Sequence, residues 1–271
     1  MTRRIAPTSK AVPSRLTPGP RRSPNGYRAP GSARGGRSNN PAAERPIGVF
    51  DSGIGGLTVL KELVAVLPRE HFIYLGDTAR LPYGTKSNEV IIKYSRENSE
   101  FLLAKGIKML VIACNTSSAV ALDRIAAETA VPVIGVIDPG ARAAAKASRS
   151  GKIGVIGTEA TIASGAYTRA IQASRPRAEI YTRACPLLVP LVEEGFLDNE
   201  IAEKTVAYYL ESLKASGIDT LLLGCTHYPF PQVPLCETLD RLFAILQFPQ
   251  QLRAPPGVGQ SVRFQLEDRV R

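Results

Sequence analysis

The chain has few of the residues on which several classes of protein depend. Its 271 residues include four cysteines and two histidines, and four cysteines in this length do not make the disulfide framework of a secreted domain. No apolar run approaches the ~20 residues of a membrane-spanning helix, and the N-terminus lacks the apolar stretch of a secretory signal. These absences favour a protein of the reducing cytoplasm.

Acidic residues are almost missing from the start of the chain. Residues 1–45 carry ten Lys and Arg but only one acid, Glu44, which leaves 24 basic and 23 acidic side chains in the rest. The net charge of +10 therefore describes a tail and not a nucleic-acid-binding face. Because this segment is rich in Pro, Gly, Ser and Arg without apolar periodicity, we expect 1–45 to be a disordered basic tail.

From Pro46 onward, short apolar runs alternate with longer helical patterns. The alternation predicts an α/β fold with parallel sheets covered on both faces. The expected strands are 47–50, 72–76, 108–113, 132–137, 152–157, 179–183 and 219–224. The expected helices are 55–67, 87–105, 117–129, 139–149, 159–173 and 198–216.

A weak internal repeat divides this region. IGVFDSGIGG from Ile47 resembles IGVIGTEATI from Ile153, and VIACNT around Cys114 resembles LLGCTH around Cys225. The similar offsets of the two pairs predict two related α/β domains, 46–135 and 136–229. Chance similarity between strands is the alternative.

The last residues differ in composition. Residues 230–271 hold six glutamines, whereas the preceding 229 residues hold one, Gln172. The α/β alternation also fades there. We therefore expect 230–271 to be an atypical segment, from a frameshifted or truncated end.

Four expected strands end in polar, small or reactive residues. In open α/β sheets, ligands lie outside the carboxyl ends of the strands, so these ends predict a site. They are Asp51-Ser52-Gly53, Gly76-Asp77-Thr78, Cys114-Asn115-Thr116 and Cys225-Thr226-His227. DSGIGG matches no nucleotide-binding pattern, and we interpret it as a turn that places Asp51 and Ser52 beside a substrate.

Two of these ends carry a cysteine. Helices are expected to begin at Thr116-Ser117 and near Pro229, and a helix N-terminus lowers a thiol pKa from ~8.5. Two such thiols suit a reaction with mirror symmetry, in which one removes a proton from a carbon and the other returns one to the opposite face.

Other interpretations of the cysteines are weaker. Cys185 and Cys236 lack this context and are expected to be structural. Zinc at Cys225 and His227 would lack further ligands, and a Cys-His hydrolase would leave Cys114 unexplained.

Taken together, five motifs resemble those of the glutamate racemases, cofactor-independent enzymes that supply D-glutamate for peptidoglycan. The motifs are GVFDSGIGGLTVL, YLGDTARLPYGTKS, VIACNTSSA, VPVIGVIDPG and LLLGCTHYP. The resemblance implies two α/β domains facing each other across a central active-site cleft, the first normally completed by the C-terminal end. It implies glutamate as substrate, with no cofactor, no metal, and no nucleic-acid or membrane partner, and it leaves a homodimer open.

The resemblance also implies roles for particular residues. Cys114 and Cys225 would be the acid and base thiols, assisted by Asp51 and His227, and one of Glu193 and Glu194 would face the site. The substrate-binding residues would be Asp51, Ser52, Tyr83, Gly84, Asn115, Thr116, Thr226 and His227. An inactive racemase-like binding protein, or a racemase for another amino acid such as aspartate, would share the same motifs.

Overall fold

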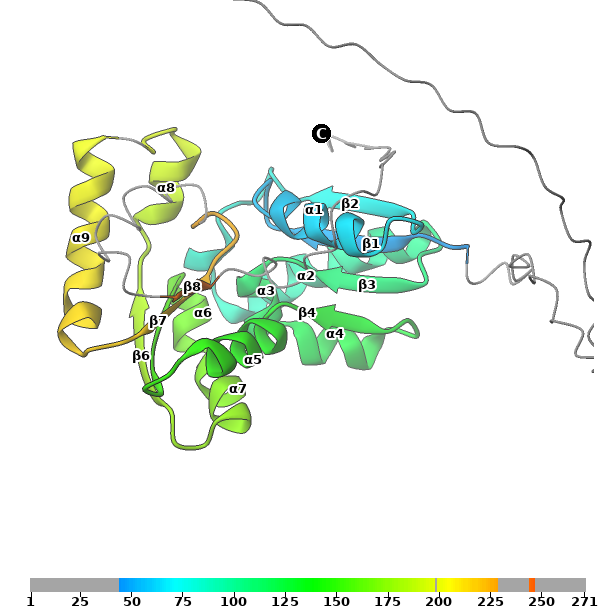
Figure 1. Cartoon of the computed structure of the whole chain (residues 1–271). Coiled ribbons are helices and arrows are strands. Elements are labelled where there is room, and N and C mark those ends of the chain that lie inside the picture. Colours follow the sequence, from blue (N-terminus) through cyan, green and yellow to red (C-terminus); the bar gives the residue numbers. More distant parts are fainter. Residues whose placement is uncertain (1–43, 198, 229–243, 247–271) are drawn as a thin grey trace, which may run out of the picture. The chain divides into compact units, whose positions relative to one another are not determined.

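The computed structural model of the chain describes residues 44–197, 199–228 and 244–246, which form two parallel four-stranded sheets with their helices (Figure 1). The predicted α/β class is confirmed. The predicted character of residues 1–45 and 230–271 falls almost wholly outside the described residues. Within the described residues, no helix combines the length and apolar character that crossing a membrane would require.

The first sheet has the strand order β2-β1-β3-β4. Its strands are β1 (Ile47–Asp51), β2 (Phe72–Gly76), β3 (Met109–Ile112) and β4 (Val133–Gly135). The segments between them form α1 (Leu57–Val66), the 3-10 turn η1 (Tyr83–Thr85), α2 (Asn88–Ala104), α3 (Asn115–Val120) and α4 (Leu122–Glu128).

The second sheet has the order β6-β5-β7-β8. Its strands are β5 (Lys152–Gly157), β6 (Glu179–Ala184), β7 (Thr220–Gly224) and β8 (Ala244–Leu246). The helices of this half are α5 (Ile137–Ala147), α6 (Glu159–Ala163), α7 (Ala166–Ser174), α8 (Leu188–Glu193) and α9 (Glu200–Ala215).

The two sheets are built on one plan. In each, the first strand lies between the second and the third, the fourth pairs with the third, and every pair is parallel. β5 therefore takes the place of β1, and β7 takes the place of β3. The sequence repeat is a structural repeat, and the two cysteines follow equivalent strands.

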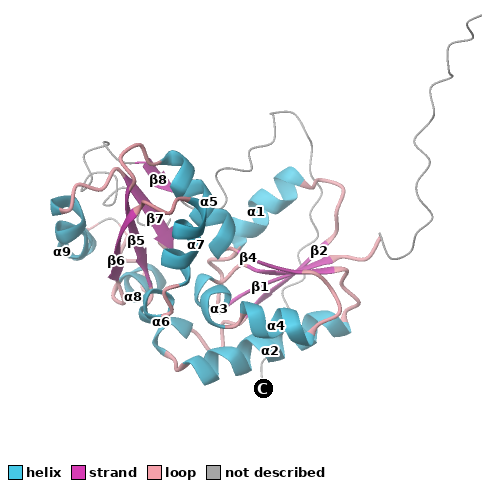
Figure 2. Ribbon diagram, turned by 90° about the horizontal axis from the view of Figure 1, so that it is seen from below, coloured by secondary structure: helices cyan, strands magenta, loops and turns pink. Residues whose placement is uncertain are grey.

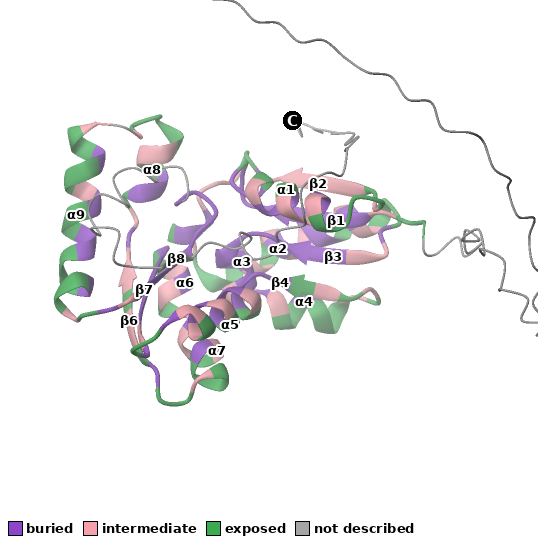
Figure 3. Ribbon diagram, viewed as in Figure 1, coloured by how far each residue is buried: buried purple, intermediate pink, exposed green. Residues whose placement is uncertain are grey.

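The central strands are apolar on both faces because helices cover both faces of each sheet (Figure 2). In β1, Val49 packs in one cluster with Leu60 of α1, whereas Phe50 packs in another with Leu102 of α2 and Ile125 of α4. Successive side chains of a strand point to opposite faces. The central strands are consequently buried along their length (Figure 3).

Several predicted boundaries are wrong. The strand expected at 132–137 ends at Gly135, and α5 already begins at Ile137. The helix expected at 159–173 is divided at Gly165, whose φ of +64° is left-handed. The helix expected at 117–129 is divided at Ala121. Two short elements were not predicted, α8 and β8, because neither is long enough to show a period.

Candidate active site

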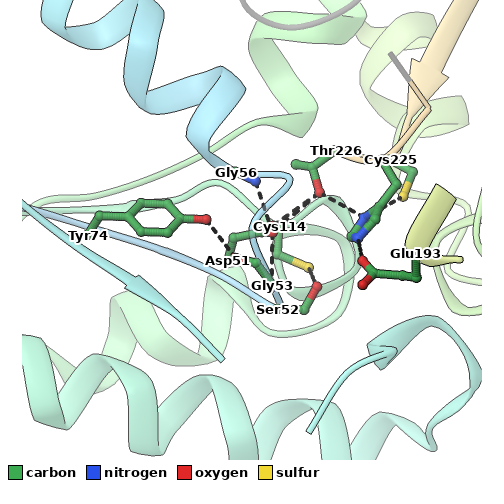
Figure 4. A network of polar contacts seen from close by, with 10 residues as sticks. Asp51, Ser52, Gly53, Gly56, Tyr74, Cys114, Glu193, Cys225 and Thr226 are labelled. Atoms are coloured by element: carbon green, nitrogen blue, oxygen red, sulfur yellow. Dashed lines mark hydrogen bonds and ion pairs between the residues drawn. The ribbon is translucent and has the colours of Figure 1, made fainter. Parts of the chain in front are cut away.

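The carboxyl ends of β1, β3 and β7 bring together five of the predicted site residues, Asp51, Ser52, Cys114, Cys225 and Thr226 (Figure 4). Each of the ten predicted site residues is buried. A direct contact joins the two halves. The hydroxyl of Thr226, which follows β7, donates to Asp51 Oδ1 at the end of β1 at 3.3 Å. The strand ends thus form one polar network across the two halves.

The DSGIGG turn wraps around the Asp51 carboxylate. Asp51 Oδ2 accepts hydrogen bonds from the backbone N–H groups of Gly53 at 3.1 Å and Gly56 at 3.0 Å. A Cβ at Gly56 would lie 2.5 Å from the Asp51 Cβ, so only glycine fits there. Burial raises the pKa of Asp51, while the charge of His227 and these hydrogen bonds oppose the rise.

Cys114 is the N-cap of α3. Its Sγ accepts from the backbone N–H of Ser117 at 3.5 Å, and its thiol donates to Ser52 Oγ at 3.5 Å. The helix therefore begins one residue before the expected Thr116, and the thiol itself caps it.

Cys225 directly follows β7, and its Sγ lies 3.9 Å from His227 Nδ1. Both cysteines are free thiols. The helix that was expected near Pro229 and the structural role that was expected for Cys236 lie outside the described residues.

The expected lowering of the Cys114 pKa by the start of α3 is outweighed in this structure, whereas the helix expected beside Cys225 lies outside the described residues. Burial raises the pKa of both thiols, and the charge of Asp51 adds to the rise. The bonds from Ser117 to Cys114 and from His227 to Cys225 lower the pKa but are outweighed. Both cysteines are consequently neutral thiols at neutral pH in this structure.

His227 connects Cys225 to a partly exposed acid. Its Nε2 lies 2.5 Å from Glu193 Oε1 on α8, while its Nδ1 faces Cys225 and lies 3.5 Å from Thr226 Oγ1. Of the two glutamates named from the sequence, Glu193 is the one that forms this contact. The Glu193 side chain is 32% exposed, so the imidazole joins a buried thiol to the surface.

The hydroxyl of Tyr83 is fully engaged within the protein. It donates to Asp77 and accepts from Asn98 Nδ2 at 3.0 Å, and Arg80 donates to Asp77 as well. Burial, followed by the hydrogen bond to Asp77, raises the pKa of Tyr83. The polar end of β2 thus holds the Tyr83-Gly84 loop, and Asp77 acts in the structure as the anchor of that loop.

Asn115 and Thr116 contact the second half of the protein. Asn115 Oδ1 accepts from the Tyr167 hydroxyl at 2.5 Å, and Thr116 Oγ1 lies 2.9 Å from Thr158 Oγ1. These two second-half residues were missed in the sequence. Thr158 could have been found, because it aligns with Ser52 in the internal repeat. Tyr167 leaves no comparable signal, since it reads as one more apolar position of a helix.

Within the described part of the chain, no three His, Cys, Asp or Glu side chains are grouped so that they could hold a metal ion. The reactive groups are therefore the two thiols, the carboxylates of Asp51 and Glu193, and the imidazole of His227. This set can hold and move protons.

The Asp/Glu/Hydantoin racemase family model matches residues 47–245. The chain belongs to this family. It is 56% identical to the glutamate racemase of Geobacter metallireducens over 195 residues, which is 72% of each chain. It is 46% identical to the glutamate racemase of Syntrophus aciditrophicus over 245 residues, or 85% of this chain and 90% of that protein.

Solved racemase structures have the same fold. The Bacillus anthracis glutamate racemase isoform RacE1 superposes with a TM-score of 0.72 at 42% identity, covering 74% of this chain and 76% of that one. The Francisella tularensis glutamate racemase, solved in complex with D-glutamate, gives a TM-score of 0.72 at 39% identity over 82% and 87% of the chains. The resemblance to glutamate racemases, the two-domain fold and the enzyme class of isomerase are thereby confirmed.

Proposed function

We propose that this protein is a cytoplasmic glutamate racemase that interconverts L- and D-glutamate and supplies D-glutamate for peptidoglycan synthesis. Cys114 and Cys225 transfer the proton. The observation that carries the proposal is the pair of free, buried thiols at equivalent strand ends of two related halves. The charge of Asp51 contributes to the raised pKa of both.

The reaction needs one thiolate and one thiol. The thiolate takes the proton from the α-carbon on one face, the carbon becomes planar, and the opposite thiol delivers its proton to the other face. In the reverse direction the two sulfurs exchange roles. Because the raised pKa values keep both thiols protonated, one proton must leave before a cycle starts. His227 is placed to take it from Cys225 and pass it to Glu193.

The remaining site residues hold the substrate in this proposal. Ser52, Asn115, Thr116 and Thr226 supply hydrogen-bonding side chains around the two thiols, and the Tyr83-Gly84 loop contributes through its backbone because the Tyr83 hydroxyl is already engaged. Glutamate is the proposed substrate because the relatives at 46–56% identity are named glutamate racemases, and the Francisella structure is a complex with D-glutamate.

We also propose that the two catalytic domains divide near residue 136. Val136 still packs with Val49 and Val111 of the first half, whereas Ile137 packs with Ile153 and Leu222 of the second. This packing supports a division within one residue of the proposed domains 46–135 and 136–229, with Val136 on the side of the first half.

The proposal is tested by proton exchange in D2O. By NMR, we expect loss of the α-proton signal from L-glutamate and separately from D-glutamate, with accumulation of the opposite enantiomer. Cys114→Ala and Cys225→Ala should each lower racemisation by about 10²–10⁴-fold, the usual contribution of a general acid or base. Cys185→Ala is the control. Cys185 is also a buried free thiol, but it donates to the backbone oxygen of Arg183 at 3.6 Å.

Two further arms separate the alternatives. L- and D-aspartate, run in parallel, identify a racemase for the shorter amino acid. Absence of exchange with both substrates from a protein that circular dichroism shows to be folded would contradict the proposed activity and favour the inactive binding protein.

A further inference from the structure

Tyr167 of α7 packs its ring in an apolar core, but its hydroxyl bonds to a residue outside that core. The side chain is 3% exposed and packs with Ile137, Ile171 and Leu222 in an apolar cluster of the second half. Its hydroxyl crosses to the first half and donates to Asn115 Oδ1 at 2.5 Å. A buried hydroxyl could have been satisfied within its own half, so this contact between the halves requires an explanation.

The ring of Tyr167 also packs against the strand that carries Cys225. A Cβ placed on Gly224 would lie 3.0 Å from the ring carbon Cε2 and 2.7 Å from the backbone oxygen of Ile156. Only a glycine allows the ring to lie so close to this strand. The charge of Cys225 is the second cause, after burial, of the raised pKa of Tyr167.

Tyr167 therefore contacts a sequence neighbour of each of the two cysteines. Asn115, which follows Cys114, receives the hydroxyl, and Gly224, which precedes Cys225, lies against the ring. Tyr167 thereby joins the contacts of Thr226 with Asp51 and of Thr116 with Thr158 that connect the two halves.

In this structure the Tyr167 hydroxyl engages the oxygen end of the Asn115 amide. A side-chain amide has one accepting oxygen and one N–H₂ group that donates twice. With Oδ1 occupied by Tyr167, Nδ2 is the end that is presented elsewhere as a donor. A donor beside Cys114 suits a carboxylate, whereas a reversed amide would present a repelling oxygen.

We propose that Tyr167 is a positioning residue for racemisation: it orients Asn115 so that the amide N–H₂ is donated to the substrate carboxylate. The inference rests on the proposed function, since it assumes a carboxylate substrate at this site. Tyr167 itself does not touch the substrate. Because the carboxylate gains negative charge as the α-proton leaves, the donated bond strengthens in the transition state, and its loss should lower kcat more than it raises KM.

The test is the Tyr167→Phe substitution, which removes the hydroxyl and keeps the ring. We expect kcat/KM to fall about ten- to a hundred-fold, the scale of a small misplacement in an active site. The fall should be the same from L- and from D-glutamate, because enantiomers have equal free energies. Tyr209→Phe is the matched control: the hydroxyl of Tyr209 on α9 accepts from the backbone N–H of Leu187 at 3.3 Å, within the second half, and turnover should be unchanged.

A double-mutant cycle separates positioning from general packing. If Tyr167 acts through Asn115, adding Tyr167→Phe to Asn115→Ala should change kcat/KM by less than about twofold. Effects that multiply, or wild-type turnover by Tyr167→Phe alone, would overturn the inference.

Crystal structures of wild type and Tyr167→Phe judge the inference without activity. A rotated or disordered Asn115 amide in the variant supports it, and an unchanged amide overturns it. If the wild type shows no turnover of glutamate, the proposed function fails and this structural comparison alone decides the role of Tyr167.

Discussion

Cys114 and Cys225 are thiols whose surroundings favour the protonated form. Burial is the main cause, and the charge of Asp51 adds to it. In the proposed mechanism, the catalytic thiolate therefore forms by transfer of its proton to a neighbouring base. His227 is the base within reach of Cys225, whereas Ser52 accepts a hydrogen bond from the Cys114 thiol but is too weak a base to take its proton.

These raised pKa values predict how stability depends on pH. A thiol titrates near pH 8.5 in the unfolded chain but higher in the fold, so its contribution is complete below about pH 8.5 and is lost as pH rises toward the folded pKa. At about pH 9.5, each thiol that stays protonated in the fold should have lowered the free energy of unfolding by about 1.4 kcal/mol relative to pH 7.

Urea unfolding of wild type and Cys225→Ala checks this prediction. Between about pH 7.5 and 9.5, below the usual tyrosine titration, the variant should lose less stability than the wild type by the share of one thiol. Cys114→Ala should behave alike. Parallel pH profiles for the variants and the wild type would mean that neither thiol is protonated preferentially in the fold.

Among the elements, the loop that carries Tyr83 and Gly84 is held by side chains of α2. Asn98 donates to the Tyr83 hydroxyl at 3.0 Å and accepts from Arg80 at 2.9 Å. The guanidinium of Arg80 also lies 4.3 Å from the centre of the Tyr94 ring. A loop with little regular structure is thereby fixed to a 17-residue helix.

We expect Asn98→Ala to loosen this loop. The substitution leaves the buried Tyr83 hydroxyl without its donor and removes one acceptor of Arg80, at a cost of about 1–3 kcal/mol in the free energy of unfolding. If the loop contributes to substrate binding, KM for glutamate should rise several-fold more than kcat falls. Steady-state kinetics and thermal unfolding measure the two effects.

Arg96→Ala on the same helix is the control for Asn98→Ala. Arg96 forms an exposed ion pair with Glu128 at 2.8 Å, and such pairs contribute about 0–1 kcal/mol. A change in KM as large for Arg96→Ala as for Asn98→Ala would show that α2 acts through its overall stability and not through the loop.

For the described molecule as a whole, the site depends on how closely the two halves approach. Gly55 in the first half faces Thr226 in the second, and a Cβ on Gly55 would lie 2.7 Å from Thr226 Oγ1 and 3.0 Å from its backbone carbon. Gly84 is equally close to Thr158 across the same boundary. Small residues on one half therefore set the distance to the other.

Gly55→Ala should push the halves apart without unfolding either one. Overpacking of this kind costs about 1–3 kcal/mol, and a displacement of the strand ends by about 1 Å would lower turnover about 10²-fold. Turnover and circular dichroism measured on the same sample test both parts of the prediction.

Gly53→Ala serves as the comparison for Gly55→Ala. It lies in the same turn, but its Cβ would meet no atom closer than 3.8 Å. Its loss of turnover should therefore be much smaller. Equal losses for the two substitutions would place the effect in the turn itself and not in the approach of the halves.

The sequence predicted local features well because they depend on neighbouring residues. Strand positions followed from apolar runs, the relation of the halves from the repeat, and the site from strand ends such as Asp51 and Cys225. It missed α8 and hence could not choose between Glu193 and Glu194, because six residues that include Pro190 show no helical period.

By itself, the sequence determined the α/β class, the repeated plan and which residues are candidates for the chemistry, since periodicity and motif spacing are written along the chain. Only the tertiary structure decided the direction of the thiol pKa values, the pairing of His227 with Glu193 and the contact of Tyr167 with Asn115. Each of these depends on burial and on distances between residues far apart in the chain, and the free energy of a charge or a hydrogen bond is set by those distances.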